Sequence, residues 1–117
     1  MKAEQIQSDI ESLNYWDARV LQLESRFFGD EITMTFEDTN YNVKLFFTGC
    51  SKFSFVTTAD DRINPLKDMT KSQIPYFLQD VGISEVQSEG KDLLKCEILM
   101  PPLNVEIVCN TISINKV

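Results

Sequence analysis

The feature that most constrains the fold is an alternation of apolar and polar residues with a period of two. It divides into four segments, residues 18–28, 31–37, 42–49 and 52–57. Successive side chains of a β-strand point to opposite faces, so this alternation predicts strands with one buried face. The turns between the segments are too short for crossover connections. We therefore expect four consecutive antiparallel strands that form a meander.

Two other stretches carry helical signals. Near the start of the chain, apolar residues recur at helical spacing and predict a short amphipathic helix: Ala3, Ile6, Ile10 and Leu13. Between residues 57 and 89 the alternation weakens. There Asn64-Pro65 predicts a turn or a single helical turn. Residues 72–82 predict a short helix with Ser72 as its cap and Gly82 at its end.

The alternation returns in the last third of the chain. Residues 83–89 and 92–100 predict a hairpin around Gly90-Lys91, and Pro101-Pro102 ends its second strand.

Residues 104–117 predict a final strand in which the apolar residues change phase, and this change indicates a bulge near Asn110. Together these elements predict a single domain over residues 1–117, of class α+β. We expect a mainly antiparallel, curved sheet of about six to eight strands in meander order. An N-terminal helix and one or two short helices in the middle complete this prediction.

Most of the aromatic residues lie on the predicted strands, where core packing is the ordinary reason for an aromatic side chain. The phenylalanines in these positions are Phe27, Phe28, Phe36, Phe46, Phe47, Phe53 and Phe55. We expect them to form the core, with Phe46 and Phe47 on opposite faces of one central strand.

The charge balance is acidic. The chain carries 18 Asp and Glu against 11 Lys and Arg, a net charge of −7. Binding to nucleic acid depends on Lys and Arg that displace counterions from phosphate, so we expect no nucleic-acid partner. A basic protein partner is compatible with this charge, because complementary fields steer association.

The residues that usually carry chemistry are missing. The sequence has no histidine, which excludes Ser–His and Cys–His nucleophile pairs and removes the commonest zinc ligand. Its four glycines form no phosphate-binding loop. Asp60 and Asp61 are adjacent carboxylates, but no third ligand stands at EF-hand spacing. We therefore expect no metal, no cofactor and no enzymatic activity.

The cysteines and the N-terminus indicate the compartment. Cys50, Cys96 and Cys109 are an odd number and lie in apolar segments, as buried thiols of a reducing compartment would. Acidic residues near the start of the chain argue against a signal peptide. No run approaches the ~20 apolar residues of a membrane span. We expect a cytoplasmic protein with no membrane partner.

Two short stretches resemble a known group of proteins. Residues 14–20 read NYWDARV and residues 45–50 read LFFTGC. They resemble the junction and the strand end of small immunity proteins from bacterial polymorphic toxin systems. The matching residues are Trp16, Asp17, Ala18, Val20, Phe47, Gly49 and Cys50. The resemblance covers about residues 5–65 and implies a protein that neutralises a cognate toxin by occupying its active site or an adjoining surface.

The junction departs from that pattern at Trp16, because those proteins often have His there. Chemistry by such a His would be lost in this chain, and a structural role fits the replacement better. We expect Trp16 to pack at the corner between helix and strand. We expect the carboxylate of Asp17 to accept backbone N–H bonds and to fix the angle of the corner.

The sequence leaves two main hypotheses for function. The first is an immunity-type protein that binds a basic toxin, and the second is a small adaptor or housekeeping domain whose acidic surface only maintains solubility. An enzyme or ligand carrier is a third and weaker alternative. Loops carry recognition more often than the scaffold does, so we predict an acidic partner-binding surface in the irregular middle. Its residues would be Asp60, Asp61, Asp80, Glu85 and Glu89.

Overall fold

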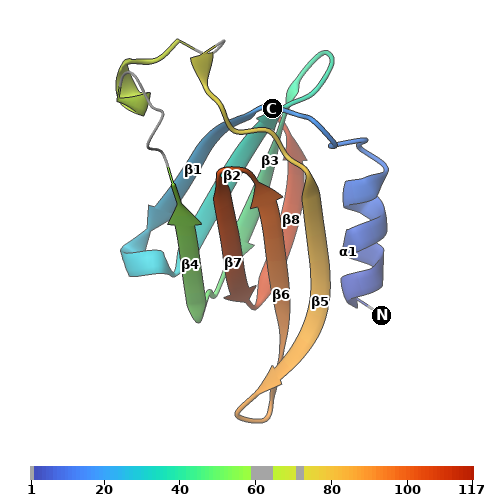
Figure 1. Ribbon diagram of the computed structural model, residues 1–117. Helices are drawn as coiled ribbons and strands as arrows, with labels where there is room; N and C mark the ends of the chain where they lie inside the picture. Colours follow the sequence, from blue (N-terminus) through green and yellow to red (C-terminus); the bar gives the residue numbers. More distant parts are fainter. Residues whose placement is uncertain (1, 59–64, 71–72) are drawn as a thin grey trace.

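The computed structural model describes residues 2–58, 65–70 and 73–117, and these residues form two antiparallel sheets and one helix (Figure 1). The elements are α1 (Lys2–Glu11), β1 (Val20–Arg26), η1 (Phe27–Gly29), β2 (Glu31–Glu37), β3 (Asn42–Thr48), β4 (Lys52–Thr57), η2 (Leu66–Asp68), β5 (Asp80–Ser88), β6 (Lys91–Met100), β7 (Leu103–Cys109) and β8 (Thr111–Lys116). The class is α+β, as predicted.

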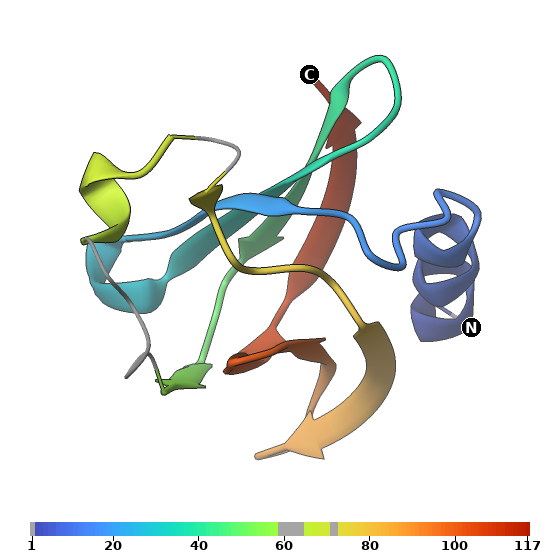
Figure 2. The same ribbon diagram turned by 45° about the horizontal axis from the view of Figure 1, so that its top comes forward.

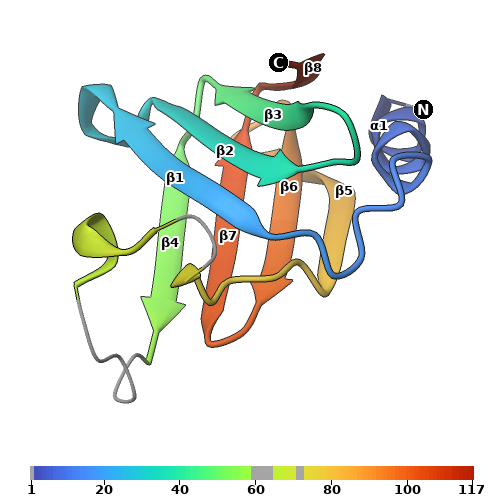
Figure 3. The same ribbon diagram turned by 90° about the horizontal axis from the view of Figure 1, so that it is seen from above.

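The strands do not form one sheet in the order of the sequence, because they divide between two sheets. One sheet has the order β1-β2-β3-β8, and the other has the order β4-β7-β6-β5. The two sheets face each other and their strands cross, as the view from above shows (Figure 3). The core lies between them, because each sheet turns its apolar face toward the other.

The alternation of the sequence accounts for the buried face of the first sheet. Strand β2 buries Ile32, Met34 and Phe36, and the cross-strand pairs Ile32↔Phe47 and Met34↔Leu45 place these residues beside buried side chains of β3. The predicted pairing of the first three strands is therefore confirmed.

The predicted fourth strand over residues 52–57 is present as β4, but its predicted pairing was wrong. Strand β4 does not pair with β3 but with β7 in the opposite sheet. Gly49 lies where the chain leaves β3 for the other sheet and has a positive φ of 63°. The predicted bulge near Asn110 is the second such crossing, from β7 to β8. A change of sheet reverses the apolar phase just as a bulge does, so the sequence signal was real and its interpretation was wrong.

The two crossings lie against each other. The backbone N–H of Asn110 donates to the carbonyl oxygens of Thr48 and Gly49, at 3.0 and 3.2 Å. A Cβ added at Gly49 would lie 2.8 Å from the Cβ of Asn110. The glycine is therefore required both by its left-handed backbone and by the close approach of the second crossing.

The predicted helix over residues 72–82 was also wrong. Ser72 lies outside the described residues, but residues 74–79 are extended and Gly82 lies inside strand β5. Pro75 disfavours helical backbone at Ile74, and the segment finds strand-like partners at the junction before β1. Figure 2 shows residues 74–79 leading into β5 beside that junction. The single helical turn after Pro65 is present as η2.

The edge strands of the two sheets differ in whether the helix α1 packs against them. Strand β5 is an edge strand, and α1 packs beside it (Figure 1). The side-chain amide of Gln7 donates to the carbonyl of Val81 at 2.9 Å and accepts from the N–H of Ile83 at 2.6 Å. Gln7 therefore caps part of the free edge of β5. Strands β1 and β4 are edge strands on the opposite side.

Candidate partner-binding surfaces

The corner between α1 and β1 is built around Tyr15, which is only 1% exposed. Its hydroxyl accepts a hydrogen bond from the backbone N–H of Val81 at 2.9 Å. The same hydroxyl lies 3.4 Å from the carboxylate of Asp80, to which it can donate. Burial raises the pKa of Tyr15 above its ordinary value, so it stays protonated as this donor. Tyr15 thus joins the corner to the start of β5.

Trp16 does not fill the corner as we expected. Its ring stacks on Tyr15 with centroids 4.3 Å apart, and 47% of the residue remains exposed. Asp17 has a positive φ of 66°, and its backbone N–H donates to the carbonyl of Leu78 at 2.7 Å. Its carboxylate accepts from the side-chain amide of Gln79 at 3.1 Å, in place of the predicted backbone donors. Tyr15 can be buried because its hydroxyl finds a hydrogen-bond partner, the N–H of Val81, inside the protein.

The predicted acidic residues are spread out along one strand. Asp60 and Asp61 lie outside the described residues. Asp80 is the first residue of β5, Glu85 lies in its middle and Glu89 lies in the turn after it. Because a strand advances about 3.3 Å per residue, Asp80 and Glu89 are roughly 30 Å apart. The structure therefore does not bring these carboxylates into one cluster.

Glu85 instead joins carboxylates that sequence reasoning missed. A shallow groove of about 330 Å³ runs between α1 and β5, and Glu4, Glu11 and Glu85 are among its lining residues. The two helix residues could have been found from the helical spacing of Glu4 and Glu11, which places both on one side of α1. We call this region, with Glu89 in the turn that follows β5, the acidic face.

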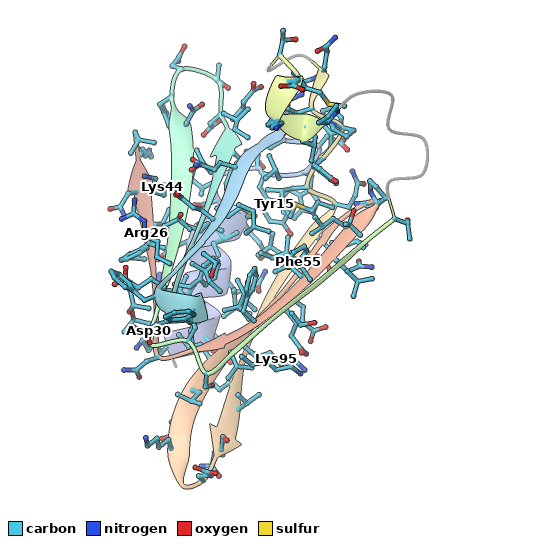
Figure 4. The ribbon with its side chains drawn as sticks, turned by 90° about the vertical axis from the view of Figure 1, so that its left-hand side faces the viewer. Tyr15, Arg26, Asp30, Lys44, Phe55 and Lys95 are labelled. Atoms are coloured by element: carbon cyan, nitrogen blue, oxygen red, sulfur yellow. The ribbon has the colours of Figure 1, made fainter. Side chains whose placement is uncertain are left out.

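The outer face of the second sheet is more balanced in charge. Glu106 pairs with Lys52 at 2.5 Å and with Lys95 at 3.1 Å, and Lys95 also pairs with Glu97 at 3.4 Å. Hydrogen bonds from Lys52 and Lys95 lower the pKa of Glu106. Figure 4 shows Lys95 on the side of this sheet that faces away from the core. These carboxylates already have cationic partners and offer less to a basic protein.

The connection between β1 and β2 presents a second surface. Phe27 is 70% exposed and Phe28 is fully exposed, although both were predicted to lie on a strand in the core. Their φ angles are 53° and 57°, and Gly29 follows with 92°. For a side chain larger than glycine, the left-handed region costs about 1–2 kcal/mol per residue. The predicted strand over residues 18–28 ends at Arg26 because the chain turns here.

An apolar groove of about 410 Å³ opens between the edge strands β1 and β4. Leu21 and Leu23 of β1 face Phe53 and Phe55 of β4 across it, and Leu66 of η2 and Ile74 line it as well. Phe55 is 54% exposed, so its predicted core position was also wrong. Figure 4 looks onto this side of the molecule and shows Phe55 between the two sheets. The groove arises because no helix covers these two edges within the described residues.

The three thiols are poor nucleophiles in this fold. Cys96 and Cys109 are buried, Cys50 is partly buried, and all three are free. Burial raises the pKa of Cys50 to about 11 and that of Cys109 to about 12, and it raises the pKa of Cys96 as well. The thiolate is the reactive form, so all three are protonated and unreactive at neutral pH.

Among the residues that the structure describes, no group of three or more Cys, Asp or Glu side chains is placed to hold a metal ion. Within the same residues, no helix has the length and apolar character needed to cross a membrane.

Comparison with known proteins agrees with the resemblance seen in the sequence. The search of curated proteins found no match. The family described as Immunity protein PIM7 matches residues 2–116, which include the corner, both sheets and the connection between β1 and β2. A match over nearly the whole length is far broader than the two short motifs that suggested it. The chain belongs to the immunity protein PIM7 family.

Proposed function

We propose that this protein neutralises a cognate bacterial toxin by binding to it, and that it performs no chemistry on the toxin. The observation that carries this proposal is the family match over residues 2–116. The protonated thiols and the lack of histidine support a binding role, because they leave few groups able to act as a nucleophile or general base at neutral pH.

Growth rescue is the direct test. A toxin gene found beside the gene for this protein would be induced in a bacterial host with this protein, with an unrelated immunity protein, or alone. Growth should recover only with this protein. Continued arrest in the presence of soluble, folded protein would contradict the proposal and would favour an adaptor or housekeeping role.

The toxin we propose is a basic one. The net charge of −7 and the acidic face would attract a cationic surface and raise the rate of encounter. At low ionic strength, about 0.01 M, the Debye length is ~30 Å, so carboxylates act across much of the molecule without touching the partner. The site of action we propose is the cytoplasm, where three free thiols remain reduced.

Charge reversal tests the steering. Glu85→Lys with Glu89→Lys should slow association with the toxin roughly tenfold at low salt and have little effect at high salt. Both side chains are exposed, so the fold should tolerate the change. Asn104→Lys with Asn115→Lys is a control that adds positive charge at exposed positions outside the acidic face. Equal association rates for wild type and the Glu85/Glu89 variant at low salt would show that these acids do not steer the encounter.

A further inference from the structure

The tip of the β1–β2 hairpin combines two features that do not stabilise this chain. Phe27 and Phe28 expose 70% and all of their surface, and neither belongs to the core cluster. Both have left-handed backbone, with φ of 53° and 57°. Glycine or asparagine would adopt this conformation with less strain, and a polar side chain would expose no apolar surface. Strained, exposed positions of this kind concentrate at sites of recognition.

The charges around the tip indicate the chemistry of its partner. The three residues on either side of the aromatic pair include the carboxylates of Glu24, Asp30 and Glu31 and the single guanidinium of Arg26. Figure 4 shows Arg26 and Asp30 at the end of the first sheet that carries η1. Aromatic rings inside a rim of net negative charge complement an apolar recess bordered by Lys or Arg. An anionic lipid surface or a second copy of this acidic chain would be repelled instead.

We propose that the hairpin tip anchors the complex, with Phe27 and Phe28 inserted into an apolar recess of the toxin that has a basic rim. This inference rests on the proposed function and names the contact through which the toxin is held. Exposed aromatic side chains are typical anchors because they bury much surface and lose little conformational entropy. The acidic face lies on the other side of the molecule, next to α1, so it acts on the encounter and the tip acts on the lifetime of the complex (Figure 1).

The test compares the tip with a matched aromatic elsewhere. The toxin used in the growth-rescue test, inactivated by a substitution in its own active site, would be immobilised, and association and dissociation rates would be measured. The tip variant is Phe27→Asn with Phe28→Asn, since asparagine tolerates left-handed backbone and should leave the fold intact. The control is Trp16→Ser, which removes an exposed aromatic at the corner between α1 and β1. Urea unfolding of each variant checks that the fold is retained.

We expect the tip variant to dissociate about 100-fold faster or more, because two central anchors are lost. Its association rate should stay within about threefold of wild type, since interface substitutions act mostly on dissociation. Trp16→Ser should dissociate like wild type.

Two outcomes would overturn the proposal for the tip while leaving the proposed function intact. One is unchanged dissociation of the folded tip variant from a toxin that wild type binds tightly. The other is binding of wild type, but not of the tip variant, to vesicles of phosphatidylethanolamine and phosphatidylglycerol, which would assign the tip to lipid. A toxin that wild type does not bind at all would refute the proposed function itself.

Discussion

Tyr15 and Trp16 are neighbours in the sequence, yet the fold uses them in opposite ways. Tyr15 is buried and holds the N–H of Val81, whereas Trp16 lies over it and keeps 47% of its surface exposed. Composition gives no means of telling these two aromatics apart. The difference arises from how the corner packs against residues 76–81, which lie more than sixty positions further along the sequence.

Alanine substitutions at these two positions should therefore have unequal costs. Tyr15→Ala should lower the free energy of unfolding by about 3–5 kcal/mol, as expected for a large buried side chain. Trp16→Ala should cost about 1 kcal/mol, since only part of its ring is covered. Urea denaturation measures both. Equal losses would mean that Trp16 fills the corner after all.

Two glycines provide a second comparison at the residue scale. Gly49→Ala should destabilise the protein by about 2 kcal/mol or more, because its φ is 63° and the new methyl group would meet Asn110 at 2.8 Å. Gly82→Ala should change stability by less than about 1 kcal/mol, since nothing lies within 4 Å of the added carbon. Thermal unfolding of both variants would settle the point, and a tolerated alanine at Gly49 would contradict the account of the crossing.

The buried thiols predict how stability depends on alkaline pH. Cys50 and Cys109 have pKa values of about 11 and 12 in the folded state, against 9.0 for an ordinary thiol. Above pH 9 the unfolded chain loses these protons while the folded chain keeps them, so stability falls as pH rises from 9 through the folded values. The raised pKa of Tyr15 adds to this loss above pH 10. Urea unfolding between pH 7 and 10.5 should show the decline.

The Cys109→Ala variant is the control for this effect. It should start from a lower stability at pH 7, because a buried side chain is shortened, and it should lose less stability per pH unit above pH 9. A slope identical to that of wild type would show that folding does not raise the pKa of Cys109, and would contradict the burial of this thiol.

At the scale of elements, the periodicity and turn residues of the sequence predicted the helices and strands that depend on local sequence alone. The α1 helix, strands β1 to β3 and the β5–β6 hairpin around Gly90 follow from periodicity and turn residues. The sheet to which a strand belongs does not follow, because β4 has the same alternation whether it pairs with β3 or β7. Gly49 and the phase change at Asn110 were the only local signs of the crossings, and each also fits a bulge.

The hairpin tip illustrates the same limit for the candidate site. Phe27 and Phe28 continue an apolar strand in the sequence, and burial is the ordinary reason for such residues. The sequence Gly29-Asp30 is typical of a turn, but the turn begins two residues earlier, at Phe27. Three successive positive φ angles at residues 27–29 carry the information, and only coordinates show them. Helical spacing places Glu4 and Glu11 on one side of α1, but their position beside Glu85 follows only from the packing of α1 on β5.

At the scale of the whole molecule, the two pairs of sheet edges have different roles. Helix α1 covers the β5 edge with acidic residues and with the capping amide of Gln7. The β1 and β4 edges remain open around an apolar groove, and the hairpin tip extends from the end of β1 (Figure 1). The fold therefore separates the charges that would attract a partner from the apolar surface that would hold it.

We propose that this immunity protein acts on its toxin by binding and not by catalysis. The most direct measurement titrates a fixed concentration of active toxin with increasing amounts of this protein and follows toxin activity. We predict that toxin activity falls linearly and reaches zero at equimolar protein. When the toxin is then separated in denaturant and refolded, its full activity should return and its mass should be unchanged. Complete inactivation by a small fraction of an equivalent, with the toxin permanently altered, would contradict it.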